Sequence, residues 1–564
     1  MDTVKIQDFI AYFEERLAPV EKASSEAYWD LATTGTEEAS REVVRIGKEY
    51  NALFSDRDEF ERVKGWYEGR EALESQILRR RLEILYKTFA GRQGDEATLT
   101  RVEELEAEAN AVYNNHRGKV EGEEKSENEL RAILRSSDDA ALRQGAWEAS
   151  KSVGGPVEGT VRELARLRNK LARDAGYPNH RVRALDLQEI DVEGLDRLME
   201  ELEATTRTPF EELRGEIDEH LKRRFGAERV MPWHLSDPFF QSCKQDTAAL
   251  PFPGSEGHPG GEPGAGNHGQ VTDEGTGATT ALDPDRFFRG KNLEALTRET
   301  YDNMGLEVRD VLARSDLYER EGKSQHAFCM GVGRDYPYDV RVLANVQPDS
   351  YWADTMLHEF GHAVYDKYIN PSLPYLLRSI AHINTTEAIA LMMGGLVDDP
   401  GWLSSVAGVS EEELAGESER ISWIGGADRL VFTRWALVMY NFEKALYEDP
   451  DRDDLNSLWW DLVEEIQLVN RPPGRDEPDW AAKIHVAVAP IYYHNYVLGH
   501  LTAAQLRRYL EDNIAGGPFY KSEIAGRYLQ EAIFGPGARD DWETTVLRAT
   551  GEELNPRYFV ESLG

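Results

Sequence analysis

The stretch HEFGH, residues 358–362, lies within a run of helical character, and its residue types are those of a metal site. Residues four apart in an α-helix lie above one another on one face, so His358 and His362 can direct two imidazoles at one ion. Glu359 flanks that ion. In the H-E-x-x-H arrangement the histidines hold zinc and the glutamate is the general base for a water molecule. The sequence therefore predicts a catalytic site with one Zn²⁺ per chain.

The third ligand must come from elsewhere, because a catalytic zinc usually has three protein ligands and leaves a fourth position open. The next strongly helical segment, SIAHINTTEAIALMMGGL, contains Glu387 as its one acidic residue. Burying a lone carboxylate among such apolar neighbours is costly unless it meets a cation or a metal. We therefore predict that Glu387 is the third ligand, and that His382 is a packed or capping residue.

Two further acids, Asp354 and Asp366, lie four residues before His358 and four residues after His362. Both fall near the ligand face of the same helix, where carboxylates often accept the second N–H of a metal-bound imidazole. A solvated position suits each of them equally well. They are candidates for orienting the imidazoles and are not predicted to be metal ligands.

Together these residues resemble the gluzincin peptidases, in particular the M2 family of angiotensin-converting enzyme and the related M3 oligopeptidases. The glutamate 25 residues after the second histidine is part of that likeness. Three more stretches, spread with the metal motif over roughly residues 230–500, are similar to these families: MPWHLSDPFFQ to a Pro-x-His-Leu segment, QHAFCMGV to a substrate strand, and KIHVAVAPIYYHNYVLG to a block with Lys-x-His and two tyrosines.

The resemblance implies a role in peptide binding or catalysis for six further residues. These are His326 and Ala327 for contact with the peptide, Lys483 and Tyr493 for its terminal carboxylate, and His485 and Tyr496 for its carbonyl oxygen. From helix geometry alone, Tyr493 and Tyr496 are three apart and project from one face, where hydroxyls can donate to an oxyanion and where aromatic packing is the alternative.

The chain departs from the M2 pattern at two places. An arginine linked to chloride activation stands between the two tyrosines in M2 enzymes, whereas this chain has His494 and Asn495 there. The M2 pattern also carries an aspartate four residues after the ligand glutamate, where this chain has Leu391. Chloride dependence is therefore not predicted, and another residue must orient the metal ligands.

The predicted function is zinc-dependent hydrolysis of peptide bonds in oligopeptides, as a peptidyl-dipeptidase or an oligoendopeptidase. Zinc polarises the scissile carbonyl while Glu359 takes a proton from water and passes it to the leaving amine. The edge of the strand DVRVLANV can align an extended peptide. Two alternatives stay open, which are a zinc carboxypeptidase of similar helical build and a metal-free helical peptide-binding protein.

The elements that must position these residues are mainly helices. Apolar residues at spacings of three and four predict helix almost throughout residues 3–230, with acidic runs such as EGEEKSENEL as solvated helix faces. The alternating stretches SQHAFCMGVG and PYDVRVLANV predict two strands beside the HEFGH helix. We expect a two-lobed, mainly α metallopeptidase around a deep cleft, with a small sheet.

A segment rich in glycine and proline separates the predicted lobes. It spans residues 250–281, contains His258 and His268, and has too few apolar residues to offset its ordering entropy. We predict an N-terminal lobe over 1–245, a disordered insertion over 246–283 and a catalytic lobe over 284–564, with Asp283 or Asp285 capping the helix that follows.

Composition excludes several classes of function. The net charge of −38 disfavours nucleic-acid binding, and no apolar run is long enough to cross a membrane. The charged N-terminus lacks a signal-peptide pattern and there are only two cysteines, so a cytoplasmic location is expected. An acidic surface that prefers arginine to lysine also suggests a protein that works in high salt. The sequence is silent on oligomeric state.

Overall fold

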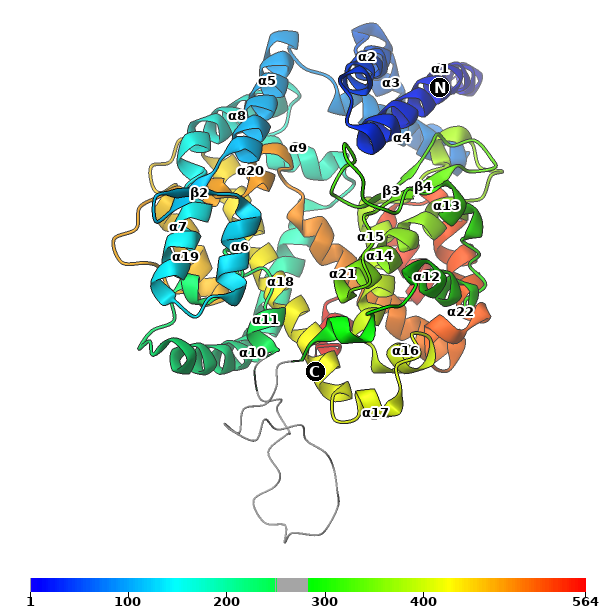
Figure 1. The fold of residues 1–564 in the computed structure, drawn as a ribbon. Coiled ribbons are helices and arrows are strands. Elements are labelled where there is room, and N and C mark those ends of the chain that lie inside the picture. Colours follow the sequence, from blue (N-terminus) through cyan, green and yellow to red (C-terminus); the bar gives the residue numbers. More distant parts are fainter. Residues whose placement is uncertain (1, 249, 251–281, 564) are drawn as a thin grey trace.

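The computed structural model describes residues 2–248, 250 and 282–563, and these residues are mostly helical (Figure 1). Within the described residues the sheets are two short antiparallel hairpins, one of which packs on the helix that carries HEFGH. The prediction of a mainly α fold with a small sheet beside that helix is confirmed. No helix in these ranges is long and apolar enough to span a membrane.

Four N-terminal helices form a unit with its own small core. Their apolar side chains, together with Tyr375 and Leu376 from a later turn, make one buried cluster. In Figure 1 this unit lies above the β3–β4 hairpin. The helices are α1 (Thr3–Thr34), α2 (Glu37–Phe54), α3 (Arg57–Glu68) and α4 (Gln76–Gly91).

The chain then builds a second group of helices, drawn at the left of Figure 1. Asp and Ser residues cap the starts of several of them by accepting backbone N–H bonds, as Asp191 does for Gly194. The helices are α5 (Glu96–Asn115), α6 (Glu127–Ser136), α7 (Ala140–Lys151), α8 (Gly154–Asp174), α9 (His180–Leu187), α10 (Val192–Phe225) and α11 (Lys244–Thr247).

The remaining helices and strands lie in residues 282–563 and include α14, the helix that carries HEFGH. They are α12 (Leu293–Asp302), α13 (Arg309–Arg314), β3 (Phe328–Gly331), β4 (Val340–Leu343), α14 (Ser350–Lys367), α15 (Ile383–Gly394), α16 (Pro400–Ser405), α17 (Glu411–Leu414), α18 (Ser418–Glu448), α19 (Leu455–Gln467), α20 (Ile484–Val488), α21 (Tyr493–Tyr509), α22 (Glu523–Leu529), α23 (Trp542–Thr550) and α24 (Arg557–Glu561).

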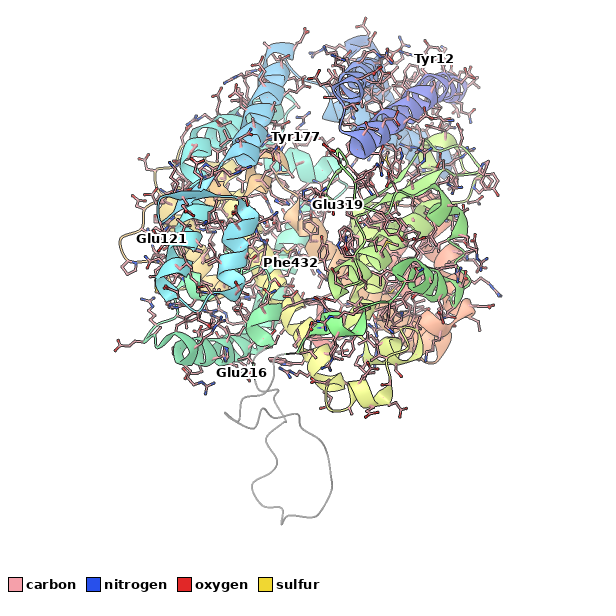
Figure 2. All side chains as sticks on the ribbon, in the orientation of Figure 1. Tyr12, Glu121, Tyr177, Glu216, Glu319 and Phe432 are labelled. Carbon is pink, nitrogen blue, oxygen red and sulfur yellow. The ribbon has the colours of Figure 1, made fainter. Side chains whose placement is uncertain are left out.

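Among the described residues, helices α18, α21 and α23 each contribute buried side chains to both large cores. The first core joins α5–α10 with most of α18, with α19 and with the first half of α21, from Tyr493 to Leu501. The second core joins α12–α17, α22 and the second half of α21, at Ala503 and Leu506. Phe432 of α18, labelled near the centre of Figure 2, contacts the ring of Tyr496 at 5.8 Å between centroids. Helices α18 and α21 therefore connect the two groups.

The lobe boundary at 246–283 stays a prediction, and the buried side chains show which segments pack together. Segments after residue 427 complete the core of the N-terminal helices, because α18 and α21 are apolar on more than one face. At the start of the expected insertion, Asp246 and Thr247 are buried in α11. Asp283 caps the next helical turn by accepting the N–H of Asp285, as expected. His258, His268 and the rest of residues 251–281 lie outside the described residues.

Two expectations about secondary structure need correction. Residues 118–125, predicted as helix, form the hairpin of β1 (Gly118–Val120) and β2 (Glu123–Lys125). Its turn residues Glu121 and Gly122 both have positive φ, which is the geometry of a tight hairpin turn and ends any helix. The predicted strands at 324–333 and 337–346 are reduced to four residues each, paired from Phe328↔Leu343 to Gly331↔Val340.

Candidate metal centre and active site

Helix α14 carries the two histidines of HEFGH. Asp349 caps it by accepting the N–H of Trp352 at 2.8 Å, and its apolar face, including Leu357 and Phe360, is buried in the second core. With that face fixed, His358 and His362 lie on the adjoining face with side chains 23% and 18% exposed. Their ring centroids are 5.0 Å apart, so the helix brings them together as predicted.

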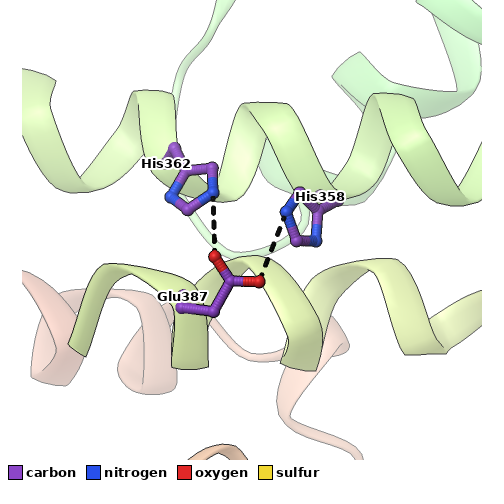
Figure 3. Close-up of side chains that lie close together, drawn as sticks. All are labelled: His358, His362 and Glu387. Carbon is purple, nitrogen blue, oxygen red and sulfur yellow. Dashed lines mark ion pairs between the residues drawn. The ribbon is translucent and has the colours of Figure 1, made fainter. Parts of the chain in front are cut away.

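Glu387 reaches the same point from helix α15. Its Oε1 lies 3.8 Å from His358 Nε2 and its Oε2 lies 3.7 Å from His362 Nε2 (Figure 3). One donor atom from each of the three residues falls within 4.8 Å of the other two. Among the described residues no lysine or arginine forms an ion pair with this largely buried carboxylate. Two imidazoles and one carboxylate at this separation fit the donor set of a catalytic zinc ion.

Glycines allow the three helices around the cluster to approach closely. A Cβ on Gly361 would lie 2.8 Å from Cα of Ala390, so α14 and α15 meet backbone to backbone. A Cβ on Gly499 of α21 would lie 2.9 Å from Cγ of Glu387. Both distances are shorter than real Cβ contacts. A side chain at Gly361 would push α15 away from α14, and one at Gly499 would shift the side chain of Glu387.

Burial makes the ligand set ready for a cation. It lowers the pKa of His358 to about 3, assisted by His362 and His500, and lowers the pKa of His362 to about 4. Both imidazoles are therefore neutral, the form that binds metal. Burial raises the pKa of Glu387 to about 7, and burial together with the charge of Glu387 raises the pKa of Glu359 to about 8. A bound cation would favour both charged carboxylates.

The imidazole of His362 is held by Thr386, and not by Asp354 or Asp366, the two candidates from the sequence. Nδ1 of His362 lies 2.8 Å from Oγ1 of Thr386. In the described part of the chain, no hydrogen bond joins Asp354 or Asp366 to either imidazole. His382 caps α15 by accepting the N–H of Asn384 at 3.1 Å, which is the capping role predicted for it.

The C-terminal block extends away from Glu387 as a row of side chains. Tyr496 is the member nearest to Glu387. Burial raises the pKa of its hydroxyl, and the charge of Glu387 is the second cause. Tyr493 follows, with its ring 5.6 Å from Tyr496 and 5.1 Å from His485. Nζ of Lys483 ends the row and donates to Oε1 of Gln241 at 2.8 Å. The structure therefore brings the four predicted residues of this block together, next to the metal cluster.

Burial sets the electrostatics of that row. It lowers the pKa of Lys483 to about 8, so the ammonium is still mostly charged at neutral pH. It lowers the pKa of His485 to about 4, with the charge of Lys483 as a second cause. Nδ1 of His485 has no hydrogen-bond partner among the described residues. A neutral imidazole beside a cation is suited to hydrogen bonding with a carbonyl oxygen or a carboxylate.

His326 and Ala327 lie just before β3, outside the strand in which they were expected. His326 is exposed, Ala327 is partly buried, and β3 packs on α14. A backbone hydrogen bond from Cys329 of β3 to Glu359 partly offsets the rise in the pKa of that carboxyl. The hairpin is thus in contact with the residue next to the metal ligands, and the segment of His326 leads into it.

Three residues that contact this site were not identified from the sequence. Gln241 ends the MPWHLSDPFFQ stretch and is the partner of Lys483. Thr386 directly precedes Glu387, and Tyr492 has its ring 5.2 Å from Tyr496. The four-residue spacing of Tyr492 and Tyr496 is a signal that could have been used. For Gln241 the sequence carries no such signal, because its partner is 242 residues away.

Comparisons with known proteins agree with this geometry. The family model for peptidase family M3 matches residues 308–564, which include α14, α15 and α21. The family model for angiotensin-converting enzyme, peptidase family M2, matches residues 1–235. This mainly α chain, with its His-His-Glu cluster, therefore resembles the M2 and M3 peptidases. The M2 match covers the N-terminal helices and ends at the Pro-x-His-Leu segment, residues 232–235, without reaching HEFGH.

A curated relative adds a third comparison. Carboxypeptidase 1 of Bacillus subtilis (strain 168) is 25% identical over 272 residues, which is 43% of this chain and 53% of that protein. The chain thus aligns with about half the length of this relative. The resemblance to zinc-peptidase families matches the one inferred from HEFGH and Glu387.

Proposed function

We propose that this protein is a zinc-dependent peptidase that hydrolyses peptide bonds in oligopeptides, using the HExxH-plus-Glu site. The observation that carries the proposal is the convergence of His358, His362 and Glu387 within 4.8 Å, two of them neutral imidazoles, next to a buried Glu359. One zinc ion per chain, held by these three residues, would act as a Lewis acid on the scissile carbonyl.

The other side chains have separate tasks in this proposal. Glu359 accepts a proton from the attacking water and transfers it to the leaving nitrogen. Tyr496 donates its hydroxyl to the oxygen that becomes negative in the transition state, with His485 as a second donor. The edge of the β3–β4 hairpin, with His326 and Ala327, aligns the peptide backbone.

Lys483 defines the end of the substrate in this proposal. Together with Gln241 and Tyr493 it would bind a free peptide carboxylate by a charge-assisted hydrogen bond. A carboxylate site at a fixed distance from the metal sets how many residues leave per cleavage. The candidates are one residue for a carboxypeptidase, two for a peptidyl-dipeptidase, and an internal cut for an oligoendopeptidase.

The carboxypeptidase candidate has one specific observation in its favour, which is the 25% identity to Carboxypeptidase 1 of Bacillus subtilis. Digestion of a defined peptide set, followed by mass analysis, separates all three modes by the size of the released fragment. The same digest with a chelator, and after zinc is restored, tests the metal requirement. A wild-type protein that binds no zinc and cleaves no peptide would contradict the proposal and favour a metal-free binding protein.

We also propose that the protein works in the cytoplasm of a cell with high internal salt. The net charge of −38 supports this, because salt screens the self-repulsion of such a surface. Cys243 and Cys329 are both free thiols, which suits a reducing compartment. The midpoint of thermal unfolding should rise between low and molar potassium chloride. A midpoint that stays constant or falls would contradict the high-salt proposal.

A further inference from the structure

The two metal-binding imidazoles differ in what holds their second nitrogen. Nδ1 of His362 lies 2.8 Å from the hydroxyl oxygen of Thr386, and Thr386 is 4% exposed. For His358 no hydrogen bond at the second nitrogen is found among the described residues. The imidazole of His362 is therefore fixed by a specific partner, whereas that of His358 is held by packing.

The direction of the His362 bond follows from the position of the other nitrogen. Nε2 of His362 faces Glu387 Oε2 at 3.7 Å, on the side where the three donor atoms converge. To bind a cation, Nε2 must present its lone pair, so the ring proton has to be on Nδ1. That N–H then donates to Oγ1 of Thr386, which accepts. The opposite tautomer would place a proton where the metal has to bind.

The carboxylates of Asp366 and Asp354, which were candidates for holding a ligand imidazole, point to other groups. An Oδ2 of Asp366 lies near Gly331 of β3, within range of the charge of Arg334. The carboxylate of Asp354 lies against Gly394 and within range of Lys244. Thr386 is thus a neutral acceptor in a place where zinc sites often have a carboxylate.

We propose that Thr386 is a positioning residue that fixes the tautomer and ring direction of His362, an inference that rests on the proposed zinc site. Helix α15 then supplies both a ligand, Glu387, and the group that orients a second ligand on α14.

Three variants test this role by zinc binding, without reference to activity. Thr386→Val keeps the shape and removes the acceptor, so the zinc dissociation constant should rise about 10- to 100-fold, the usual effect of losing such a partner. Thr386→Ser keeps the acceptor and should stay within about threefold of wild type. Thr33→Val is the matched control, because Thr33 is also buried and its hydroxyl bonds only to carbonyls of its own helix, α1.

The measurement is competition for Zn²⁺ against a chromogenic chelator, with the unfolding midpoint of each zinc-free variant as a check on folding. If Thr386→Val does not fold, Thr386→Ala replaces it. Weak zinc binding by the Val variant, rescued in the Ser variant, supports the proposal. Wild-type affinity in Thr386→Val, or equal weakening in Thr386→Ser, overturns the proposal while leaving the proposed peptidase intact. A wild-type protein that binds no zinc overturns both.

Discussion

The three proposed metal ligands lie on two regular helices, whereas the block that would bind the peptide end lies on short, irregular segments. His358, His362 and Glu387 are carried by α14 and α15, which pack directly on each other inside one core. Lys483 directly follows a short 3-10 turn, Asp479–Ala482, and His485 lies in the five-residue helix α20. The first region holds its geometry by itself, and the second depends on neighbours from distant parts of the chain.

The dependence of the second region is visible at Ile491. This residue has φ of 52°, a left-handed conformation that is strained for a β-branched side chain. Buried Glu443 of α18 accepts its N–H at 2.9 Å, and Gln188 donates to its carbonyl oxygen at 3.4 Å. Gln188 also accepts from Asn495 at 2.9 Å. Residues from both halves of the chain therefore set the start of α21, where Tyr493 and Tyr496 lie.

This difference means that chemistry and recognition of the peptide end should be separable by mutation. The largest effect is expected from the ligands. Replacing His358, His362 or Glu387 by Ala should reduce bound zinc to well below one per chain and abolish hydrolysis, because each supplies one of three protein ligands. Metal analysis after dialysis measures this. Full zinc retention by any two of the variants would contradict the assigned ligand set.

The next effect concerns the base. Glu359→Gln keeps the shape and hydrogen-bonding capacity of the side chain but cannot accept a proton. Bound zinc should stay at the wild-type level while kcat falls about 10²- to 10⁴-fold, the usual contribution of general acid–base catalysis. Steady-state kinetics on one peptide give the ratio. A kcat within tenfold of wild type would remove Glu359 from that role.

Tyr496 tests the point at which the two regions meet. Tyr496→Phe should lower kcat about 10²- to 10³-fold for peptides with free and with amidated C-termini alike, because its hydroxyl would contact an oxygen that is negative only near the transition state. Tyr351→Phe, at an exposed residue in the first turn of α14, is the control for a lost hydroxyl. A change confined to KM would make Tyr496 a ground-state binding or packing residue.

Lys483 should give the smallest effect, and one limited to recognition. Lys483→Ala should lower kcat/KM for free-acid peptides about 10- to 100-fold, the magnitude of a charge-assisted hydrogen bond, and should leave amidated peptides nearly unchanged. Parallel assays of the two peptide forms measure this. An equal loss for both forms would place Lys483 in the general architecture of the site.

The wild-type pH profile provides a second measure of the same lysine. Burial lowers the pKa of Lys483 from its ordinary value to about 8, so the ammonium is present below that pH and is lost as the pH rises through it. The ratio of kcat/KM for free-acid over amidated peptide should therefore fall between pH 7 and pH 9. Taking the ratio cancels titrations that affect both peptides, such as that of Glu359. A constant ratio would contradict the proposed contact.

The sequence by itself determined the class of fold and predicted that His358, His362 and Glu387 meet. The spacing of His358 and His362 fixes their shared face once a helix forms, and Glu387 stands out as one acid in an apolar helix. The same local periodicity indicates helices almost everywhere. These features depend on residues within a few turns of each other, so local rules are sufficient to predict them.

Only the tertiary structure decided which residues support that cluster and how the cores divide. Thr386, rather than Asp354 or Asp366, meets His362, because the rotation of α15 against α14 depends on the close contact at Gly361. Lys483 meets Gln241 across 242 residues of sequence, and α18 and α21 contribute to two cores at once. Such pairings follow from the packing of whole helices, which depends on the summed contacts of many side chains and leaves no mark in the spacing of any one segment.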